Sequence, residues 1–142
     1  MSVVQTVTTS FKVEILNGYH AFSASYRPAD TFNIALYSTV VTLDSTVTAY
    51  SPVGEASGGS YVPGGQIIAP IAPLASGTTA CLSFNPVSWA GVITANSALI
   101  YNSSQGGRSV CVLNFGANKT SATNFSITFP TDDQNNAVVR IA

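Results

Sequence analysis

The residues of this chain whose types could do chemistry are few and lie far apart in the sequence. His20 is the sole histidine, so a catalytic triad or a general base would have to be built on it. No Gly-x-Ser-x-Gly nucleophile motif accompanies it. A histidine packed in a loop or lying on the surface is the simpler interpretation. The sequence therefore predicts a protein that is not an enzyme and has no catalytic residue.

The carboxylates are scattered, and only Asp132 and Asp133 adjoin. They lie in a polar stretch at 130–136, where aspartates accept hydrogen bonds from local backbone amides. Turn chemistry is therefore favoured over a glycosidase pair or a calcium site. Cys81 and Cys111 lack the spacing of a zinc or redox site, and we expect two free thiols rather than a disulfide. We predict no metal site and no cofactor.

The tyrosines could form an aromatic platform for a sugar, but they are evenly dispersed along the chain. Tyrosines at strand ends usually bury the ring and expose the hydroxyl. The glycine pair Gly64-Gly65 lacks the strand-to-helix setting of a phosphate loop. With 8% charged residues and a net charge of −1, no patch could neutralise several phosphates, so we expect no nucleic-acid partner.

The strongest structural pattern runs from 97 to 129. Two runs rich in aliphatic and aromatic residues, 98–101 and 109–115, flank Gly106-Gly107, which supplies the positive φ values of a tight reversal. This pattern predicts a β-hairpin. A third run, 125–129, alternates apolar residues with hydroxyl residues. A sheet that is buried on one side fits all three runs.

Elsewhere the pattern predicts short strands separated by turns, and a long ordered loop between 51 and 77, where proline and glycine are dense. Further strands are expected at 11–16, 31–37, 46–50, 66–69, 79–84, 87–89 and 137–141. About eight to ten short strands predict an all-β fold, either an antiparallel β-sandwich or a jelly-roll-like barrel.

The chain length is that of one domain, which we place at 11–142. Residues 1–10 are expected to form an N-terminal arm, either a frayed terminus or a segment that pairs with a neighbouring subunit. No stretch is apolar for long enough to span a bilayer, and no signal-peptide pattern opens the chain. We therefore expect no membrane partner.

Several segments together resemble a family of small virion proteins of tailed bacteriophages. They are 12–18, 30–37, 54–61 with Gly64-Gly65, 98–102 and 113–116, and the resemblance extends from about Phe11 to Ile141. It implies a virion structural protein without catalytic residues, and within that class a capsid decoration (cement) protein, a β-sandwich that trimerises on the outside of the head. The first ten residues and the segment 20–27 depart from the family pattern.

On this basis we expect a protein that is assembled in the bacterial host cytoplasm, binds the major capsid protein as a homotrimer and stabilises the capsid. A surface made neutral by serine, threonine and glycine suits such contacts. A tail or head-to-tail connector component and a carbohydrate-binding module on the virion are the alternatives. The expected partner contacts are Tyr50, Glu55, Tyr61, Pro63, Gly64, Gly65, Ile67 and Ile68.

Overall fold

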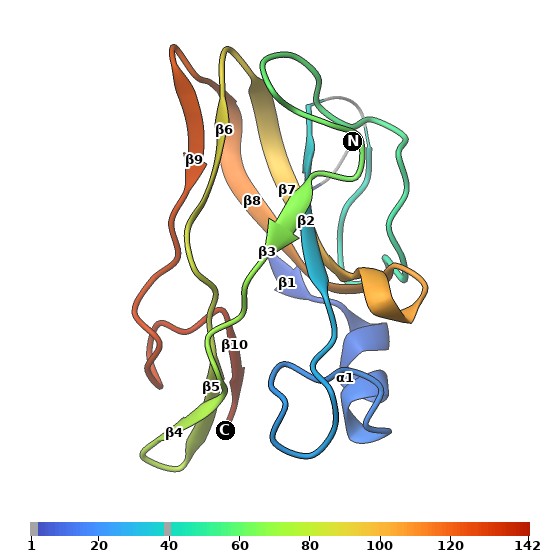
Figure 1. Ribbon diagram of the computed structural model, residues 1–142, viewed down its shortest axis with the longest axis vertical. Coiled ribbons are helices and arrows are strands. Elements are labelled where there is room, and N and C mark those ends of the chain that lie inside the picture. Colours follow the sequence, from blue (N-terminus) through green and yellow to red (C-terminus); the bar gives the residue numbers. More distant parts are fainter. Residues whose placement is uncertain (1–2, 39–40) are drawn as a thin grey trace.

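The computed structural model describes residues 3–38 and 41–142, and this part of the chain is an antiparallel all-β fold with one short α-helix (Figure 1). Its elements are β1 (Thr6–Val7), α1 (Thr9–Leu16), β2 (Phe32–Tyr37), β3 (Gln66–Ile68), β4 (Leu74–Ser76), β5 (Thr79–Leu82), β6 (Val87–Ala90), β7 (Thr94–Asn102), η1 (Ser103–Gln105), β8 (Arg108–Thr120), β9 (Asn124–Ile127) and β10 (Val139–Ile141). The predicted all-β class and strand number are confirmed.

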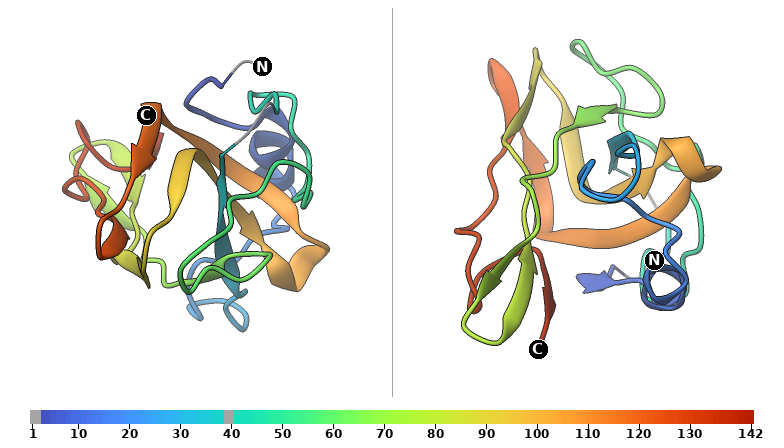
Figure 2. Two further views of the ribbon diagram at one scale, coloured as in Figure 1. Left: turned by 90° about the horizontal axis from the view of Figure 1, so that it is seen from above. Right: turned by 60° about the horizontal axis from the view of Figure 1, so that its bottom comes forward.

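The strands form a sandwich of one large sheet and two small ones rather than a closed barrel. The large sheet has the order β1-β8-β7-β2-β3, and the small sheets are β10-β5-β4 and β6-β9. Figure 2 shows the small sheets along one side of the molecule, with α1 on the far side. Between the layers lies the main apolar core, which contains Phe11, Phe32, Ile34, Phe84 and Trp89. The only tryptophan of the sequence is thus buried.

The predicted hairpin is confirmed and forms the longest strand pair of the large sheet. β7 and β8 pair in antiparallel register, with Ala98 opposite Leu113. The connection is the turn η1, whose start is capped by the side chain of Asn102, followed by Gly106 and Gly107 at φ 64° and 73°. Because L-residues with a Cβ rarely adopt such angles, the glycine pair determines where the chain reverses.

The large sheet is buried on both faces, whereas the sequence pattern indicated one. Ala35, Tyr37, Leu99 and Tyr101 form a second apolar cluster on the outer face of β2 and β7. The segment 41–50 covers this cluster, with Leu43 packed into it. The alternation of apolar and polar residues did not predict this, because the segment 41–50, and not solvent, lies against the second face.

The predicted strand at 11–16 is wrong, since Thr9–Leu16 is an α-helix. Phe11 and Ile15 lie four residues apart and both pack on the core, while Val13 and Leu16 are exposed. Apolar residues that alternate over so short a run also include a pair at i and i+4. The two-residue period of a strand therefore cannot be distinguished from the 3.6-residue period of a helix. The helix ends at Leu16, and Gly18, which follows the C-cap Asn17, has the left-handed φ of 71° that is common just after a helix.

Two further expectations for the loops also need correction. The predicted strand at 46–50 is a single bridge, Ala49 with Arg108, and the predicted loop 51–77 contains β4 in addition to the expected β3. Of the predicted arm, residues 1 and 2 lie outside the described residues. β1 pairs with β8 of the same chain, and the expected boundary between residues 10 and 11 falls within α1.

A buried polar network holds the loop 19–30 against the hairpin turn. Asn102 Oδ1 accepts from the backbone N–H of Ser104, so its amide nitrogen donates to both Asp30 and His20 Nδ1. The Nε2 of His20 therefore carries the proton and donates to Glu14 over 2.9 Å. Both ring nitrogens of the sole histidine are used in structural hydrogen bonds.

Asp30 is the hub of the network. Burial alone would raise the pKa of its carboxyl, but hydrogen bonds from Arg27, Asn102 and the backbone N–H of Ala21 hold that pKa at about 2. An aspartate in the unfolded chain has a pKa of 3.8. The carboxylate therefore stabilises the folded chain above about pH 4, and this contribution is lost as the pH falls towards 2.

We predict that Asp30→Asn lowers the free energy of unfolding at pH 7 by roughly 2 kcal/mol. Because the variant lacks the titrating group, it should also lose stability less steeply than the wild type between pH 4 and pH 2. Urea unfolding followed across that range measures both effects. An unchanged slope in the variant would contradict the role given to Asp30.

Candidate interaction surface

Four tyrosines that are dispersed in the sequence converge in space around Glu55. Tyr50 and Tyr61 come from the loop that follows β2, and Tyr37 and Tyr101 come from the neighbouring strands β2 and β7. Even spacing along the sequence was therefore a poor guide to their arrangement, because strand pairing brings distant positions together. The expected contacts Tyr50, Glu55, Tyr61 and Gly64 all belong to this group.

The carboxylate of Glu55 is fully used inside the molecule. Its Oε1 accepts from the hydroxyl of Tyr61 at 2.6 Å and from the backbone N–H of Gly64 at 2.9 Å, and its Oε2 accepts from the hydroxyl of Tyr50 at 2.7 Å. The Tyr61 hydroxyl in turn accepts from the backbone N–H of Leu36 in β2. We call Glu55 and its three donors the Glu55 clasp. The clasp joins Tyr50 to Tyr61 and Gly64 and, through the Tyr61 hydroxyl, ties the loop 50–64 to the large sheet.

Tyr37 and Tyr101, the two tyrosines in the strands of the large sheet, also hold the loop. The hydroxyl of Tyr101 donates to the Gly64 carbonyl at 2.6 Å, that of Tyr37 donates to the Ser51 carbonyl at 2.7 Å, and the ring of Tyr50 stacks on that of Tyr101. Burial, together with the nearby Glu55 carboxylate, raises the pKa of all four tyrosines. The hydroxyls therefore stay protonated at neutral pH and keep donating.

Gly65 lets the loop lie directly on β2. Its φ is 75°, and a Cβ at this position would overlap the carbonyl oxygen of Ile34. Only glycine allows so close an approach of two backbones. The predicted importance of the glycine pair thus has a physical cause in packing, not in ligand binding.

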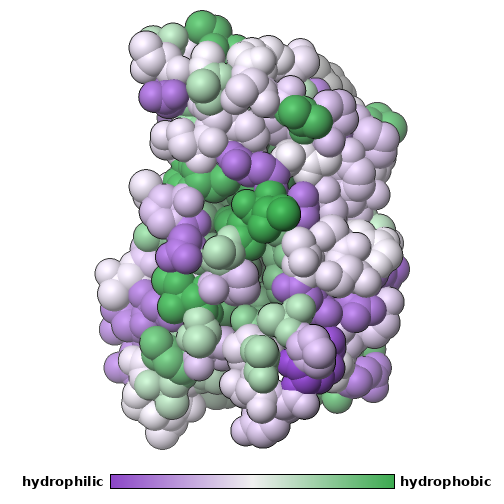
Figure 3. Space-filling view, in the orientation of Figure 1, coloured by the Kyte–Doolittle hydropathy of each residue, from purple (hydrophilic) through white to green (hydrophobic). Residues whose placement is uncertain are grey.

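The fixed loop presents apolar side chains to solvent. Ile67 in β3 is 67% exposed and Pro63 is exposed, whereas Ile68 is buried in the core and does not reach the surface. Val53 and Val62 are 70% and 62% exposed, and the sequence analysis did not single them out. The only sign of their exposure in the sequence was their position in a loop that is dense in glycine and proline. Figure 3 shows apolar residues running down the middle of the face that carries β3.

The remaining candidates for chemistry have structural roles. Asp133 accepts from the backbone N–H groups of Asn135 and Asn136, which confirms the predicted turn chemistry for this residue. The prediction does not hold for Asp132, whose carboxyl oxygens are buried and accept no hydrogen bond from the described residues. Cys81 and Cys111 are free, buried thiols, as expected, and burial raises the pKa of Cys111 to about 12. Within residues 3–38 and 41–142, no group of three or more His, Cys, Asp or Glu side chains could hold a metal ion.

Comparison with family models, curated proteins and solved structures finds no match to the chain. Among the described residues, no helix is long and apolar enough to cross a membrane.

We predict that Tyr61→Phe lowers the free energy of unfolding by about 1–3 kcal/mol, because it leaves the N–H of Leu36 without its acceptor and removes one of the two donors to Glu55 Oε1. Tyr26→Phe is the matched control, since the Tyr26 side chain is fully exposed. Urea unfolding of both variants measures the difference. Equal stability of the two would show that the Glu55 clasp does not hold the loop.

We also predict that Gly65→Ala lowers the free energy of unfolding by more than about 4 kcal/mol, because the added Cβ overlaps the backbone of β2. Gly106→Ala is the control, because Gly106 has a similar φ of 64° but nothing within 4 Å of an added Cβ. The control should lose only about 1–2 kcal/mol, the cost of a left-handed conformation. Circular dichroism and urea unfolding compare the two, and similar losses would contradict the close backbone approach at Gly65.

Proposed function

We propose that this protein is a non-enzymatic structural protein of a phage virion, and most specifically a capsid decoration protein that binds the outer shell of the head. The observation that carries the proposal is the exposure of the apolar residues Val53, Val62, Pro63 and Ile67 along one chain segment. These side chains are exposed although the backbone beneath them is fixed by the Glu55 clasp. A rigid apolar surface loses little conformational entropy when a partner covers it.

The scarcity of charge supports the same proposal. Of the five basic residues, Arg27 and Arg108 are already paired with Asp30 and Glu14 inside the molecule. The surface is left mainly with hydroxyl, amide and apolar groups, which can be buried against another protein without a large desolvation cost. Long-range electrostatic attraction would contribute little to such a contact.

Decoration would stabilise the shell through binding linkage. A protein that binds the assembled shell, and not its free subunits, raises the stability of the shell by an amount that grows with occupancy. If the decorating unit is a trimer, as the family resemblance implies, three linked contacts strengthen one another through effective concentration. No catalytic group is needed for either effect.

Cryo-electron microscopy of the particle that carries this protein tests the proposal. A decoration protein should appear in hundreds of copies as a regular lattice on the outer shell. Density at a single vertex or along the tail would instead assign the protein to the head-to-tail connector or the tail. Absence of the protein from the purified particle would overturn a virion role altogether.

We predict that Ile67→Asp reduces binding to undecorated shells by at least tenfold, since it places a charge in the proposed contact. Ile141→Asp is the control, because Ile141 is also more than half exposed but lies in β10, away from the loop. Co-sedimentation with shells measures binding, and urea unfolding confirms that both variants fold. Equal binding of both variants would remove this surface from the contact.

A further inference from the structure

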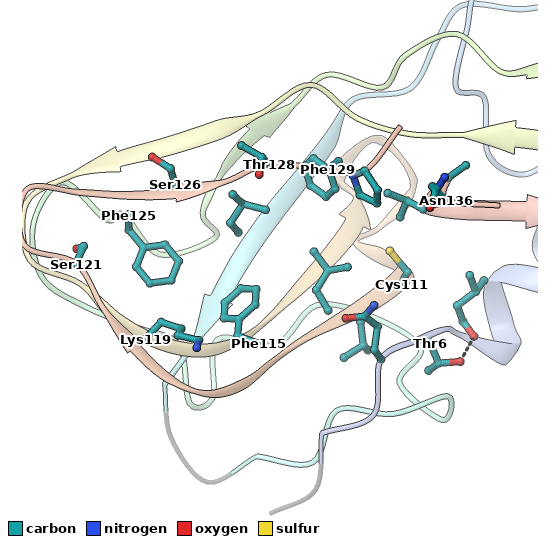
Figure 4. A pocket seen from close by; sticks show the side chains of 18 of the residues that line it. Thr6, Cys111, Phe115, Lys119, Ser121, Phe125, Ser126, Thr128, Phe129 and Asn136 are labelled. Carbon is teal, nitrogen blue, oxygen red and sulfur yellow. Dashed lines mark hydrogen bonds between the residues drawn. The ribbon is translucent and has the colours of Figure 1, made fainter. Parts of the chain in front are cut away.

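The sandwich is open along one side, where a groove of about 870 Å³ runs between β8 and β9. This volume lies towards the upper end of the range for ligand sites, roughly 300–1,000 Å³. In Figure 4, Phe125 of β9 and Phe115 of β8 point towards one another inside it, and their ring centroids lie 6.0 Å apart. Its half-buried apolar side chains are Val7, Leu113, Phe115, Phe129 and Val138.

β9 has no strand on the side that faces the groove. It pairs with β6 in a two-stranded sheet, and every residue from Asn124 to Pro130 lines the groove. In an antiparallel strand, alternate residues direct their N–H and C=O groups to opposite sides. Within the described residues, β9 therefore presents a row of backbone donors and acceptors that no other strand uses.

The opposite wall differs, because its edge is already occupied. β1 pairs with Cys111 and Val112, and beyond it the side chain of Gln5 accepts from the N–H of Asn114. The side chain of Asn114 then accepts from the N–H of Gly116. As far as Gly116, the wall formed by β8 thus offers apolar side chains but few free backbone groups.

The charges of the groove have one sign. Among the described residues, Lys119 and Arg140 are the only charged ones that line it, and no carboxylate does. Arg140 donates to the carbonyls of Gln134 and Asn135, whereas Lys119 forms no ion pair with any described carboxylate. Arg140 also lies close enough to Asp133 to help lower the pKa of that carboxyl, so Lys119 is the less compensated of the two positive charges.

We propose that this groove binds an extended segment of a different protein, which adds to the free edge of β9 as a new strand. Backbone pairing requires a peptide, since an acyl chain would fill the apolar walls but leave the donors and acceptors of β9 unsatisfied. Apolar side chains at alternate positions of the segment face Leu113, Phe115 and Phe129, and an acidic residue near one end faces Lys119. The proposal depends on the groove alone and does not require the virion role.

A second copy of the chain is a poorer occupant. If β9 paired with β9 of another copy, each strand would be covered only by a strand that is itself a wall of a groove. The apolar walls of both grooves would therefore stay uncovered. Such pairing would also bring two sets of basic groove residues, Lys119 and Arg140, towards each other. A foreign acidic strand avoids both costs.

The test uses the whole protein and a capped peptide in which valine alternates with threonine and aspartate stands at both ends. We expect the peptide to bind and to slow amide exchange along β9, as measured by NMR. A peptide with lysine at both ends should bind at least about threefold more weakly, and one with N-methylated amides should not bind. Lys119→Glu should weaken binding of the acidic peptide at least about threefold, whereas Lys12→Glu, an exposed lysine of α1, should not change it.

Three results would overturn the proposal. The first is no binding of the acidic peptide, and the second is binding that leaves β9 exchange unchanged. The third is protection of β9 in the absence of peptide together with dimers in light scattering, which would assign the free edge to a second copy.

Discussion

The structure is constrained above all by the burial of its central strands on both faces. β2 and β7 have side chains in the main core on one side and in the outer cluster of Tyr37, Leu99 and Tyr101 on the other. Neither of the two small sheets contributes a residue to the outer cluster, and among the described residues a loop covers it instead. Because backbone groups that are buried against the sheet cannot be left without hydrogen-bond partners, the covering loop needs fixed attachment points. The Glu55 clasp provides them.

Polar groups inside this molecule hold loops in place through hydrogen bonds rather than act as reactive groups. The Glu55 clasp holds one loop to the face of the large sheet, and the network of Asp30, Asn102 and His20 holds another to the hairpin turn. In both, a carboxylate accepts several hydrogen bonds from neighbours that the fold brings together. A chain with so few charged residues concentrates two of its six carboxylates at these two positions, where each determines the path of a loop.

Local signals in the sequence were sufficient for part of this fold. Gly106 and Gly107 mark the hairpin because the requirement for positive φ is local, and alternation in 125–129 marks β9 because one face of that strand meets the core. Phe11 and Ile15 could not be assigned to a helix because the run is too short to separate the two periods. The tyrosines around Glu55 were missed as a group for a different reason. Their proximity follows from the pairing of β2 with β7, which residue spacing does not reveal.

The attachment of the N-terminal segment has a consequence for how the protein is made. Thr6 pairs with Val112, the hydroxyl of Thr8 bonds that of Ser109, and Glu14 bonds Arg108. These partners lie about a hundred residues later, so the contacts of β1 and α1 with β8 cannot form during synthesis until most of the chain has left the ribosome. Contacts of such sequence separation also slow folding. The first residues to be synthesised are therefore among the last to reach their final positions, and Phe11 must remain shielded from aggregation until then.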